Sequence, residues 1–403
     1  MRLAIVSTYP PSRGSLNEYA YYFVEHLRRK LEIDEVILLT DDLSDGASYP
    51  QAPDRVRILP SWRFGAMNNA LRIRQTVEQI KPDAVLFNMQ FATFGDKRIP
   101  GALGLTAPML IKQMGIPVIV LLHNIMETID LSKAGFGANP VMEHITRLGG
   151  DLFTRMLLSA DMVAVTIPKY VELLEAKYKA KNVMLAPHGA FEDAPPPSID
   201  PHPSVLRIMT FGKFGTYKRV EVLIDAFQLL RHHLPDTSME LVIAGTDSPN
   251  AGGYLEQVRT RYATVPNIVY TGYVAESDVA RIFSEATIVV FPYNSTTGSS
   301  GVLHQTGNYA RPAVLPNLGD FAELIQEEGY TGEFFEPENA ASLAAAIRRY
   351  WENPDKRRQD AMQNYLSSVG IPISEVVDWY LLHLEPLLQA RVKQPAKEKS
   401  QWT

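Results

Sequence analysis

Short apolar runs alternate with amphipathic segments along the first half of the chain. Each run is hydrophobic at consecutive positions and rich in β-branched residues. Continuous runs of this kind are typical of strands buried on both faces of a parallel sheet, with helices as the crossover connections. The predicted strands are Leu3–Ser7, Val36–Thr40, Ala84–Asn88, Val118–Asn124, Met162–Thr166 and Val183–Pro187.

The second half repeats this pattern after a proline-rich interruption. The segment APPPSIDPHP, at Ala194–Pro203, has five prolines in ten residues, which is typical of a stiff linker. The fold class predicted is therefore α/β, with two doubly wound parallel-sheet domains that bind ligands beyond the carboxyl ends of strands, in a cleft between the domains. The strands predicted in the second half are Arg207–Gly212, Glu240–Gly245, Ile268–Gly272, Ile288–Pro292, Ala313–Pro316 and Glu333–Phe335.

The predicted domain boundaries follow from this reading. The first domain covers 1–194, the linker 195–203 and the second domain 204–370. Apolar residues at helical spacing in Ile373–Leu388 predict a C-terminal helix at 371–390 that packs back on the first domain. The polar residues at 391–403 predict a disordered tail.

Composition narrows the class of protein. The chain has 403 residues and a net charge of -6, from 45 acidic and 39 basic residues without a long basic run, so nucleic acid is not an expected partner. It has no cysteine, which excludes disulfides, thiol nucleophiles and cysteine-ligated zinc and fits the cytoplasm. The longest apolar stretch, Ile116–Leu122, is too short to span a bilayer. Peripheral contact with the inner face of the membrane stays open, because basic and aromatic residues occur at Arg63, Phe64, Lys97, Arg98 and Lys112.

The stretch Phe291–Asp320 has the form of an anion site. An apolar strand ends near Tyr293, a loop of small residues follows, and a short helix from about Gly301 ends before Arg311-Pro312. Small residues admit a ligand close to the backbone, and a helix start offers unpaired N–H groups and the positive end of its dipole. A phosphate or diphosphate suits such a site. The alternative is an ordinary helix start, capped by Ser299 or Ser300.

A second candidate anion site joins a strand to a helix in the same half. The segment Gly212-Lys213-Phe214-Gly215-Thr216-Tyr217-Lys218 places two lysines in one loop after a glycine, where an ammonium acts as a point charge on phosphate. The alternative is a solvated pair of surface lysines.

The first half offers its own candidates at strand ends. Gly14 precedes Ser15-Leu16-Asn17-Glu18, a capping-box pattern that predicts Ser15 as N-cap and Glu18 as its partner. There is no GxGxxG, so a nicotinamide or flavin cofactor is not expected. His123-Asn124 ends another predicted strand, where a histidine can hydrogen-bond or transfer a proton. His188-Gly189 is a weaker candidate, because a turn before the linker explains it.

These motifs resemble the retaining family 4 glycosyltransferases of the GT-B fold. The second half carries the most specific evidence, with five segments in the family's order: GKFGTYKRVEVLIDAF, LVIAG, IVYTGYV, GSSGVLHQTGNYARPAV and GEFFEPENAASLAAAI. The resemblance covers nearly the whole chain and implies two Rossmann-like domains. The second domain would bind a nucleotide-sugar donor, and the first would bind the acceptor.

The resemblance also implies roles for individual residues. His123, Lys213 and Lys218 match the catalytic positions: the lysines would bind the diphosphate, and the histidine would position the transferred sugar. The donor-binding residues implied are Gly14, Gly212, Thr271, Tyr273, Val274, Thr297, Ser300, Gly301, Val302, Leu303 and Gln305. The acceptor-side candidates are Asn17, Asn88, Gln90 and Asn124.

The chain departs from the family at several of these positions. Two glutamates with seven residues between them are usual, and Thr297 and Gln305 stand in their places. Gln305 can still hydrogen-bond a ribose hydroxyl, whereas Thr297 is too short to replace a glutamate. Arg219 replaces a frequent glycine and Asn124 a frequent aspartate.

The expected activity is retaining, metal-independent hexosyl transfer from a nucleotide sugar to a hydroxyl of a saccharide or a lipid-linked acceptor. UDP-glucose is the first expectation for the donor and GDP-mannose the second; no further cofactor is expected. The missing glutamates leave a non-catalytic nucleotide-sugar binding protein as one alternative. A sugar-nucleotide epimerase of the GT-B fold is another, and a phosphorylase is disfavoured because no cofactor lysine site is recognisable.

Overall fold

The computed structural model describes residues 1–12, 14–43, 47–125, 127, 140–191, 204–248, 251–295 and 300–393. The chain divides into two compact units. The first contains the described residues within 1–127, 144–187 and 374–403, and the second those within 128–143 and 188–373. The linker predicted at 195–203 lies outside the described residues.

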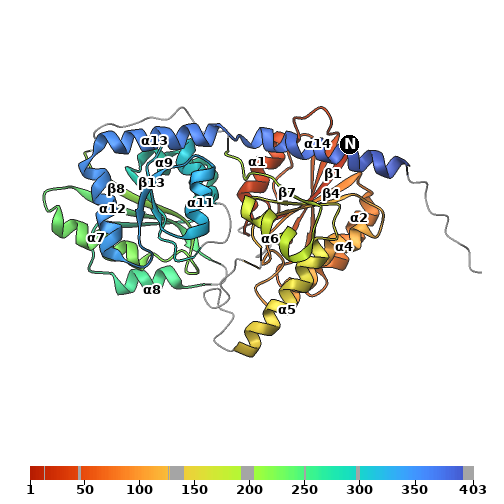
Figure 1. Ribbon diagram of the computed structural model, residues 1–403, viewed down its shortest axis with the longest axis horizontal. Coiled ribbons are helices and arrows are strands. Elements are labelled where there is room, and N and C mark those ends of the chain that lie inside the picture. The colour runs from red at the N-terminus through yellow and green to blue at the C-terminus, as the bar shows by residue number, and fades with distance from the viewer. Residues whose placement is uncertain are drawn as a thin grey trace, which may run out of the picture. The chain divides into compact units, whose positions relative to one another are not determined.

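The first unit is built on a seven-stranded sheet in the order β3-β2-β1-β4-β5-β6-β7, and every pairing in it is parallel. Helices cover both faces of the sheet (Figure 1). Its strands are β1 (Arg2–Val6), β2 (Glu35–Asp41), β3 (Val56–Trp62), β4 (Ala84–Met89), β5 (Val118–Leu122), β6 (Met162–Val165) and β7 (Val183–Leu185). Its helices are α1 (Asn17–Leu27), α2 (Asn69–Ile80), α3 (Arg98–Gly104), α4 (Ala107–Lys112), α5 (Pro140–Leu157), α6 (Pro168–Tyr178) and α14 (Ile373–Lys393).

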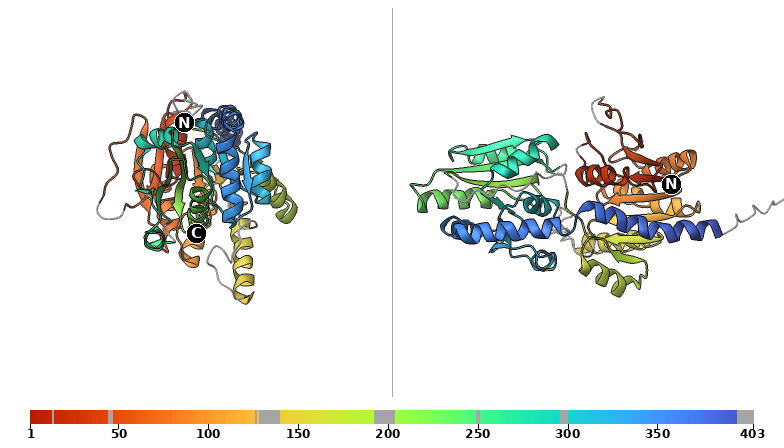
Figure 2. Two further views of the ribbon diagram at one scale, coloured as in Figure 1. Left: turned by 90° about the vertical axis from the view of Figure 1, so that its left-hand side faces the viewer. Right: turned by 90° about the horizontal axis from the view of Figure 1, so that it is seen from above.

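The second unit repeats the architecture with six parallel strands in the order β10-β9-β8-β11-β12-β13, again between layers of helices (Figure 2). Its strands are β8 (Leu206–Phe214), β9 (Met239–Asp247), β10 (Ile268–Gly272), β11 (Ile288–Val290), β12 (Ala313–Pro316) and β13 (Gly332–Phe335). Its helices are α7 (Glu221–His233), α8 (Tyr254–Arg261), α9 (Glu276–Glu285), α10 (Gly301–Asn308), α11 (Gly319–Glu327), α12 (Ala340–Glu352) and α13 (Pro354–Val369).

The prediction of two doubly wound parallel sheets is confirmed. All twelve predicted strands are present. Strands β4, β5, β6, β11 and β12 are buried along their whole length, as continuous apolar runs predict. The prediction missed β3, an edge strand that is only partly buried and contains Arg57 and Pro60. Proline is tolerated at sheet edges, where one side of the strand needs no partner.

The predicted capping box at the start of α1 is wrong. The helix begins at Asn17, and its N-cap is Leu16 in the left-handed conformation (φ 67°), without a side-chain cap. The Thr8 hydroxyl instead donates to the Ser15 carbonyl, and the Asn17 amide donates to the Ser12 carbonyl (2.8 Å). The loop is therefore held by bonds to Thr8 and Ser12, which follow β1, and not by a reciprocal cap.

The C-terminal helix α14 continues to Lys393, three residues beyond the predicted boundary, so 391–393 are helical and not part of a tail. It packs on α1 through Tyr380 and Phe23, whose ring centroids lie 5.4 Å apart. Lys30 and Asp378 form an ion pair (2.6 Å) in the same interface. Within the described ranges, no helix is both long and apolar enough to cross a membrane.

In each sheet the strands are added first toward one edge and then, from the middle, toward the other edge. In the first unit the direction changes between β1 and β4, and in the second between β8 and β11. Loops that leave the carboxyl ends of such neighbouring strands diverge to opposite faces, which opens a crevice for ligands.

Candidate functional site

Two glycines bring β8 and β9 close together at their carboxyl ends. Gly212 and Gly245 are register partners, and both have a φ of +136°, where a side chain is disfavoured. A Cβ on Gly245 would lie 1.9 Å from the Gly212 carbonyl oxygen. A Cβ on Gly212 would lie 2.7 Å from Lys218 Nζ. The backbone at Gly212 therefore leaves the space that the Lys218 ammonium occupies.

Lys218 is buried, with only 8% of its surface exposed. A backbone bridge pairs it with Tyr293 beyond β11, and its Nζ lies 4.9 Å from the centroid of the Tyr293 ring and 5.7 Å from that of Tyr217. Burial raises the pKa of the Tyr293 hydroxyl, while the Lys218 charge opposes that shift. A fixed ammonium thus stands at the strand-order reversal of the second unit.

Tyr293 connects this lysine to the start of α10. Its hydroxyl lies 3.4 Å from Ser300 Oγ, the residue that precedes the helix. Ser300 is extended and its side chain does not cap the helix, whereas its carbonyl accepts from Leu303 N (2.8 Å) and His304 N (3.3 Å). The two predicted anion sites therefore meet at Tyr293. The alternative prediction, that Ser300 caps the helix with its side chain, is wrong.

The other predicted donor residues of the second unit lie around this point. Lys213 is the residue after Gly212 on β8 and stands beside Thr246 of β9. Leu303 and Gln305 of α10 are buried, and Val302 packs on the apolar core. Thr297 lies outside the described residues.

The end of β10 adjoins the same edge of the sheet. Thr271 Oγ1 accepts from Gly245 N (3.2 Å) and donates to the Gly272 carbonyl (2.8 Å). Tyr273 is 51% exposed, and Val274 packs on the core below it. The predicted base-binding loop thus presents an exposed aromatic ring one strand away from the glycine pair.

In the first unit, His123 is buried at the carboxyl end of β5. Its Nε2 lies 2.7 Å from Asn88 Oδ1, and the Asn88 amide donates to Ser7 Oγ (2.9 Å). Because a carbonyl oxygen only accepts, this contact selects the tautomer protonated at Nε2. Tyr19 meets the imidazole edge to face at 4.8 Å. The ends of β1, β4 and β5 thus fix the orientation of this histidine.

The remaining acceptor-side candidates hold loops in this structure. Asn124 Oδ1 accepts from Phe91 N (3.2 Å), Gln90 N donates to Thr93 Oγ1 (2.8 Å), and Asn17 donates to Ser12 as described above. Asn88, by contrast, contacts His123 directly.

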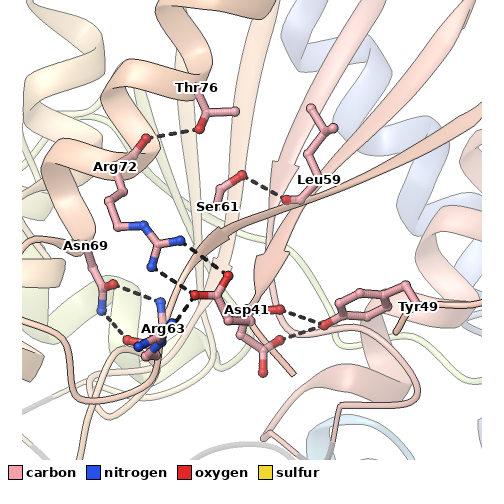
Figure 3. Close-up of polar contacts among 9 residues, drawn as sticks. Asp41, Tyr49, Leu59, Ser61, Arg63, Asn69, Arg72 and Thr76 are labelled. Carbon is pink, nitrogen blue, oxygen red and sulfur yellow. Dashed lines mark hydrogen bonds and ion pairs between the residues drawn. The ribbon is translucent and has the colours of Figure 1, made fainter. Parts of the chain in front are cut away.

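The loop that contains Gly14 is tied to Asp41, a residue that the sequence analysis missed. Gly14 N donates to Ser12 Oγ (3.2 Å), which donates to Asp41 Oδ2 (2.6 Å). Tyr49 donates to Asp41 Oδ1 (3.1 Å), as Figure 3 shows. A Cβ on Gly14 would lie 2.3 Å from Thr8 Cγ2, so only glycine fits. The position of Asp41, directly after the run Val36–Thr40, was the available signal.

Beside Asp41, two arginines form ion pairs with Asp42. Arg72 Nη1 lies 3.0 Å from Asp42 Oδ2 and Arg63 Nε 3.2 Å from the same atom. Across the parts of the chain that are described, no group of histidine, aspartate and glutamate side chains is arranged to hold a metal ion.

Comparisons with known proteins bear on this arrangement. The family described as "Glycosyl transferases group 1" matches residues 206–353, which contain Lys213, Lys218 and α10. The O-antigen chain mannosyltransferase C of Escherichia coli is 22% identical over 362 residues, covering 86% of this chain and 87% of that protein. The GDP-mannose:glycolipid 4-beta-D-mannosyltransferase of Xanthomonas campestris pv. campestris is 28% identical over 171 residues, 41% of this chain and 46% of that protein.

Solved structures agree on the architecture. Sucrose-phosphate synthase from Thermosynechococcus elongatus superposes with a TM-score of 0.75 at 17% identity, covering 97% of this chain and 99% of that one. HepE from Anabaena, solved with UDP-glucose, gives 0.69 at 12% identity, covering 96% and 100%. The chain is a glycosyltransferase of the GT-B fold. This glycosyltransferase has its family match on the unit where Lys218 and the start of α10 meet.

Proposed function

We propose that this glycosyltransferase is a retaining, metal-independent hexosyltransferase that uses a nucleotide sugar and transfers to a hydroxyl of a saccharide or lipid-linked acceptor. The observation that carries the proposal is the convergence of Lys218 and the start of α10 on Tyr293. An ammonium and a helix start are both suited to the negative charge that develops on a departing nucleoside diphosphate. Lys213 would add a further cation from the end of β8.

The proposed independence from metal ions rests on these groups. Lys218, Lys213 and the helix start would supply the positive charge that a divalent cation supplies in other transferases. In the retaining mechanism proposed, the leaving phosphate takes the proton of the acceptor hydroxyl as that oxygen bonds to the anomeric carbon. His123, fixed by Asn88, would orient the sugar and would not act as the nucleophile.

The names of the relatives favour a different donor from the one expected first. UDP-glucose is the frequent donor of the family that the sequence resembles. Two of the matched relatives are, by name, mannosyltransferases, and one of them is named for GDP-mannose. We therefore propose GDP-mannose as the donor, with UDP-glucose as the second candidate. Their names also support an acceptor that belongs to a growing polysaccharide or glycolipid.

An acceptor of that kind agrees with a proposed place at the inner face of the membrane. Five exposed apolar side chains lie on or just before α2 and on α3, two helices of the first unit that contact each other. A backbone hydrogen bond from Gly65 to Phe94 (2.8 Å) links the loops that precede these helices. We name this surface the apolar patch; its residues are Phe64, Met67, Leu71, Ile99 and Leu103. Lys97 and Arg63 lie in the same segments; Arg63 pairs with Asp42 (3.2 Å), and Lys112 pairs with Asp161 (3.0 Å).

The test is transfer itself, with products identified by NMR. The protein is incubated with GDP-mannose or UDP-glucose, a panel of saccharide and glycolipid acceptors, and EDTA. The proposal expects release of the nucleoside diphosphate and a glycoside with the anomeric configuration of the donor. Inversion would contradict the retaining mechanism, and activity only after metal addition would contradict metal independence. Tight donor binding without transfer or hydrolysis would make the chain a binding protein, and a changed sugar without acceptor would make it an epimerase.

A further inference from the structure

Four buried polar side chains lie behind the first turn of α10, and none of them enters the mechanism above. They are His188 and Tyr330 from connecting segments, His304 from α10 itself, and Glu328, the residue after α11. We name them the α10 support network. His304 is 1% exposed, and His188, Glu328 and Tyr330 are nearly as inaccessible.

The two histidines pack on each other and on the helix start. Their rings are stacked, with centroids 4.8 Å apart and planes 9° from parallel. His188 Nδ1 donates to the Gly189 carbonyl (2.9 Å), which turns the other edge of the ring toward Gly301. A Cβ on Gly301 would lie 3.5 Å from His188 Cε1 and 3.6 Å from Nε2. His188 thus forms the floor under the first residue of α10.

His304 also contacts Tyr330 and Glu328. Its Nδ1 lies 2.8 Å from the Tyr330 hydroxyl, just before β13. Its Nε2 lies 3.7 Å from Glu328 Oε2, and neither atom has a hydrogen-bond partner in the described part of the chain. One proton shared between these two atoms would satisfy both after a small approach. The carboxyl group and the imidazole are therefore arranged as a pair.

The network favours a neutral state at pH 7. Burial lowers the pKa of His188 to about 4 and that of His304 well below its ordinary value. Burial, and then the Glu327 carboxylate, raises the pKa of Glu328 to about 8. From α13, the Ser368 hydroxyl faces the network, where it contacts His304 and Tyr330, and this hydroxyl does not titrate. An ionised Glu328 would place a negative charge behind the site proposed for the diphosphate.

Helix α13 and Phe191 also hold α10 in place. Ser368 donates to the His304 carbonyl (3.0 Å) and to Asn308, and Asn308 donates to the Phe191 carbonyl. Gly307 leaves no room between α10 and α13, because a Cβ there would lie 2.6 Å from the Asn364 carbonyl oxygen. Contacts with α13 and Phe191 thus hold the last turn, whereas the network packs against the first turn at Gly301 and His304.

We propose that the α10 support network positions the first turn of α10 for the donor diphosphate, with His188, His304 and Tyr330 as positioning residues. This inference rests on the proposed function, because it assigns the diphosphate to that turn. Hydrogen bonds from backbone amides to phosphate weaken steeply as their angles open, so a small shift of the turn would reduce affinity. The network itself would touch no atom of the donor.

The test compares nucleotide and nucleoside binding in His188→Ala and Tyr330→Phe. Titrations of GDP and UDP by calorimetry, and of guanosine and uridine by NMR, separate contacts to the diphosphate from contacts to the base. Both variants are expected to bind the diphosphate about tenfold more weakly and the nucleoside within about twofold of wild type. Tyr350→Phe is the matched control, because its buried hydroxyl bonds Asp360 in another part of the same unit (2.7 Å).

The outcomes are distinguishable. If wild type binds neither GDP nor UDP, the proposed function fails and the inference falls with it. If wild type binds one of them and Tyr330→Phe binds it as tightly as Tyr350→Phe does, the inference alone is overturned. Equal losses for nucleotide and nucleoside would also overturn it, because they would indicate general disorder of the unit. Should circular dichroism show that His188→Ala is unfolded, Tyr330→Phe decides the question.

Discussion

Gly212 shows how one residue without a side chain controls a charged group. Its φ of +136° and the 2.7 Å between a notional Cβ and Lys218 Nζ mean that any substitution both strains the backbone and moves the ammonium. The same reasoning applies to Gly14, where Thr8 fills the space. At both places the glycine defines where a neighbouring group lies.

Replacement of Gly212 by alanine is therefore expected to impair donor binding. The strain should destabilise the protein by about 1–3 kcal/mol, and displacement of Lys218 should weaken nucleoside diphosphate binding by about tenfold. Thermal unfolding and calorimetric titration measure the two effects. Gly252→Ala is the control, since a Cβ at that position meets nothing within 4 Å. Equal behaviour of the two variants would contradict the role given to Gly212.

Helix α10 shows which parts of an element can be predicted from sequence. Its start at Gly301 followed from the small residues before it, and the strands around it followed from continuous apolar runs. The stacking of His188 on His304 could not be predicted, because the two residues are 116 positions apart in the sequence and only the fold brings them together. The same holds for Asp41, which reaches the Gly14 loop from the neighbouring strand. The edge strand β3 was missed for the different reason that it lacks a continuous apolar run.

The pH dependence of stability should show whether Glu328 is protonated in the folded protein. Its pKa of about 8 exceeds the ordinary 4.5, so the folded state keeps a proton that the unfolded state releases, and stability falls as pH rises toward 8. His188, with a pKa of about 4 against 6.5, has the opposite effect below pH 6.5. Between pH 6.5 and 8 the Glu328 effect remains, amounting to about 2 kcal/mol.

The variant Glu328→Gln isolates this contribution. Glutamine imitates the neutral acid and cannot ionise, so the variant should lose less stability than wild type between pH 6.5 and 8. Denaturant titrations at several pH values give the free energy of unfolding for both proteins. Parallel curves across this range would show that Glu328 is not held in its protonated form.

At the scale of the whole molecule, the two units carry different kinds of surface. The second unit brings its candidate residues together at the carboxyl ends of its central strands, whereas the first also exposes the apolar patch. Isolated exposed apolar residues are ordinary, but neighbouring ones with basic residues beside them are typical of membrane contact. The sequence predicted the basic and aromatic residues of this surface. Its apolar residues on α2 and α3 could be recognised only from their exposure in the folded chain.

Removal of apolar side chains from the patch should weaken membrane association. The double variant Phe64→Ser/Ile99→Ser is expected to bind vesicles of phosphatidylglycerol and phosphatidylethanolamine at least about tenfold more weakly, since each buried apolar side chain contributes about 1.5–3 kcal/mol. Co-sedimentation measures this. Leu382→Ser, an exposed leucine on α14, is the control. Absence of vesicle binding by wild type, or an equal loss in the control, would contradict the membrane proposal.

The most direct test of the central claim is the transfer rate of Lys218→Ala in the presence of EDTA. The claim is that a buried ammonium beside the start of α10 stabilises the departing nucleoside diphosphate. Its removal is expected to lower kcat/KM for the donor by about 100-fold to 1,000-fold. Lys181→Ala, an exposed lysine of the first unit, should leave the rate unchanged. A Lys218→Ala protein that transfers sugar as fast as Lys181→Ala would contradict the account.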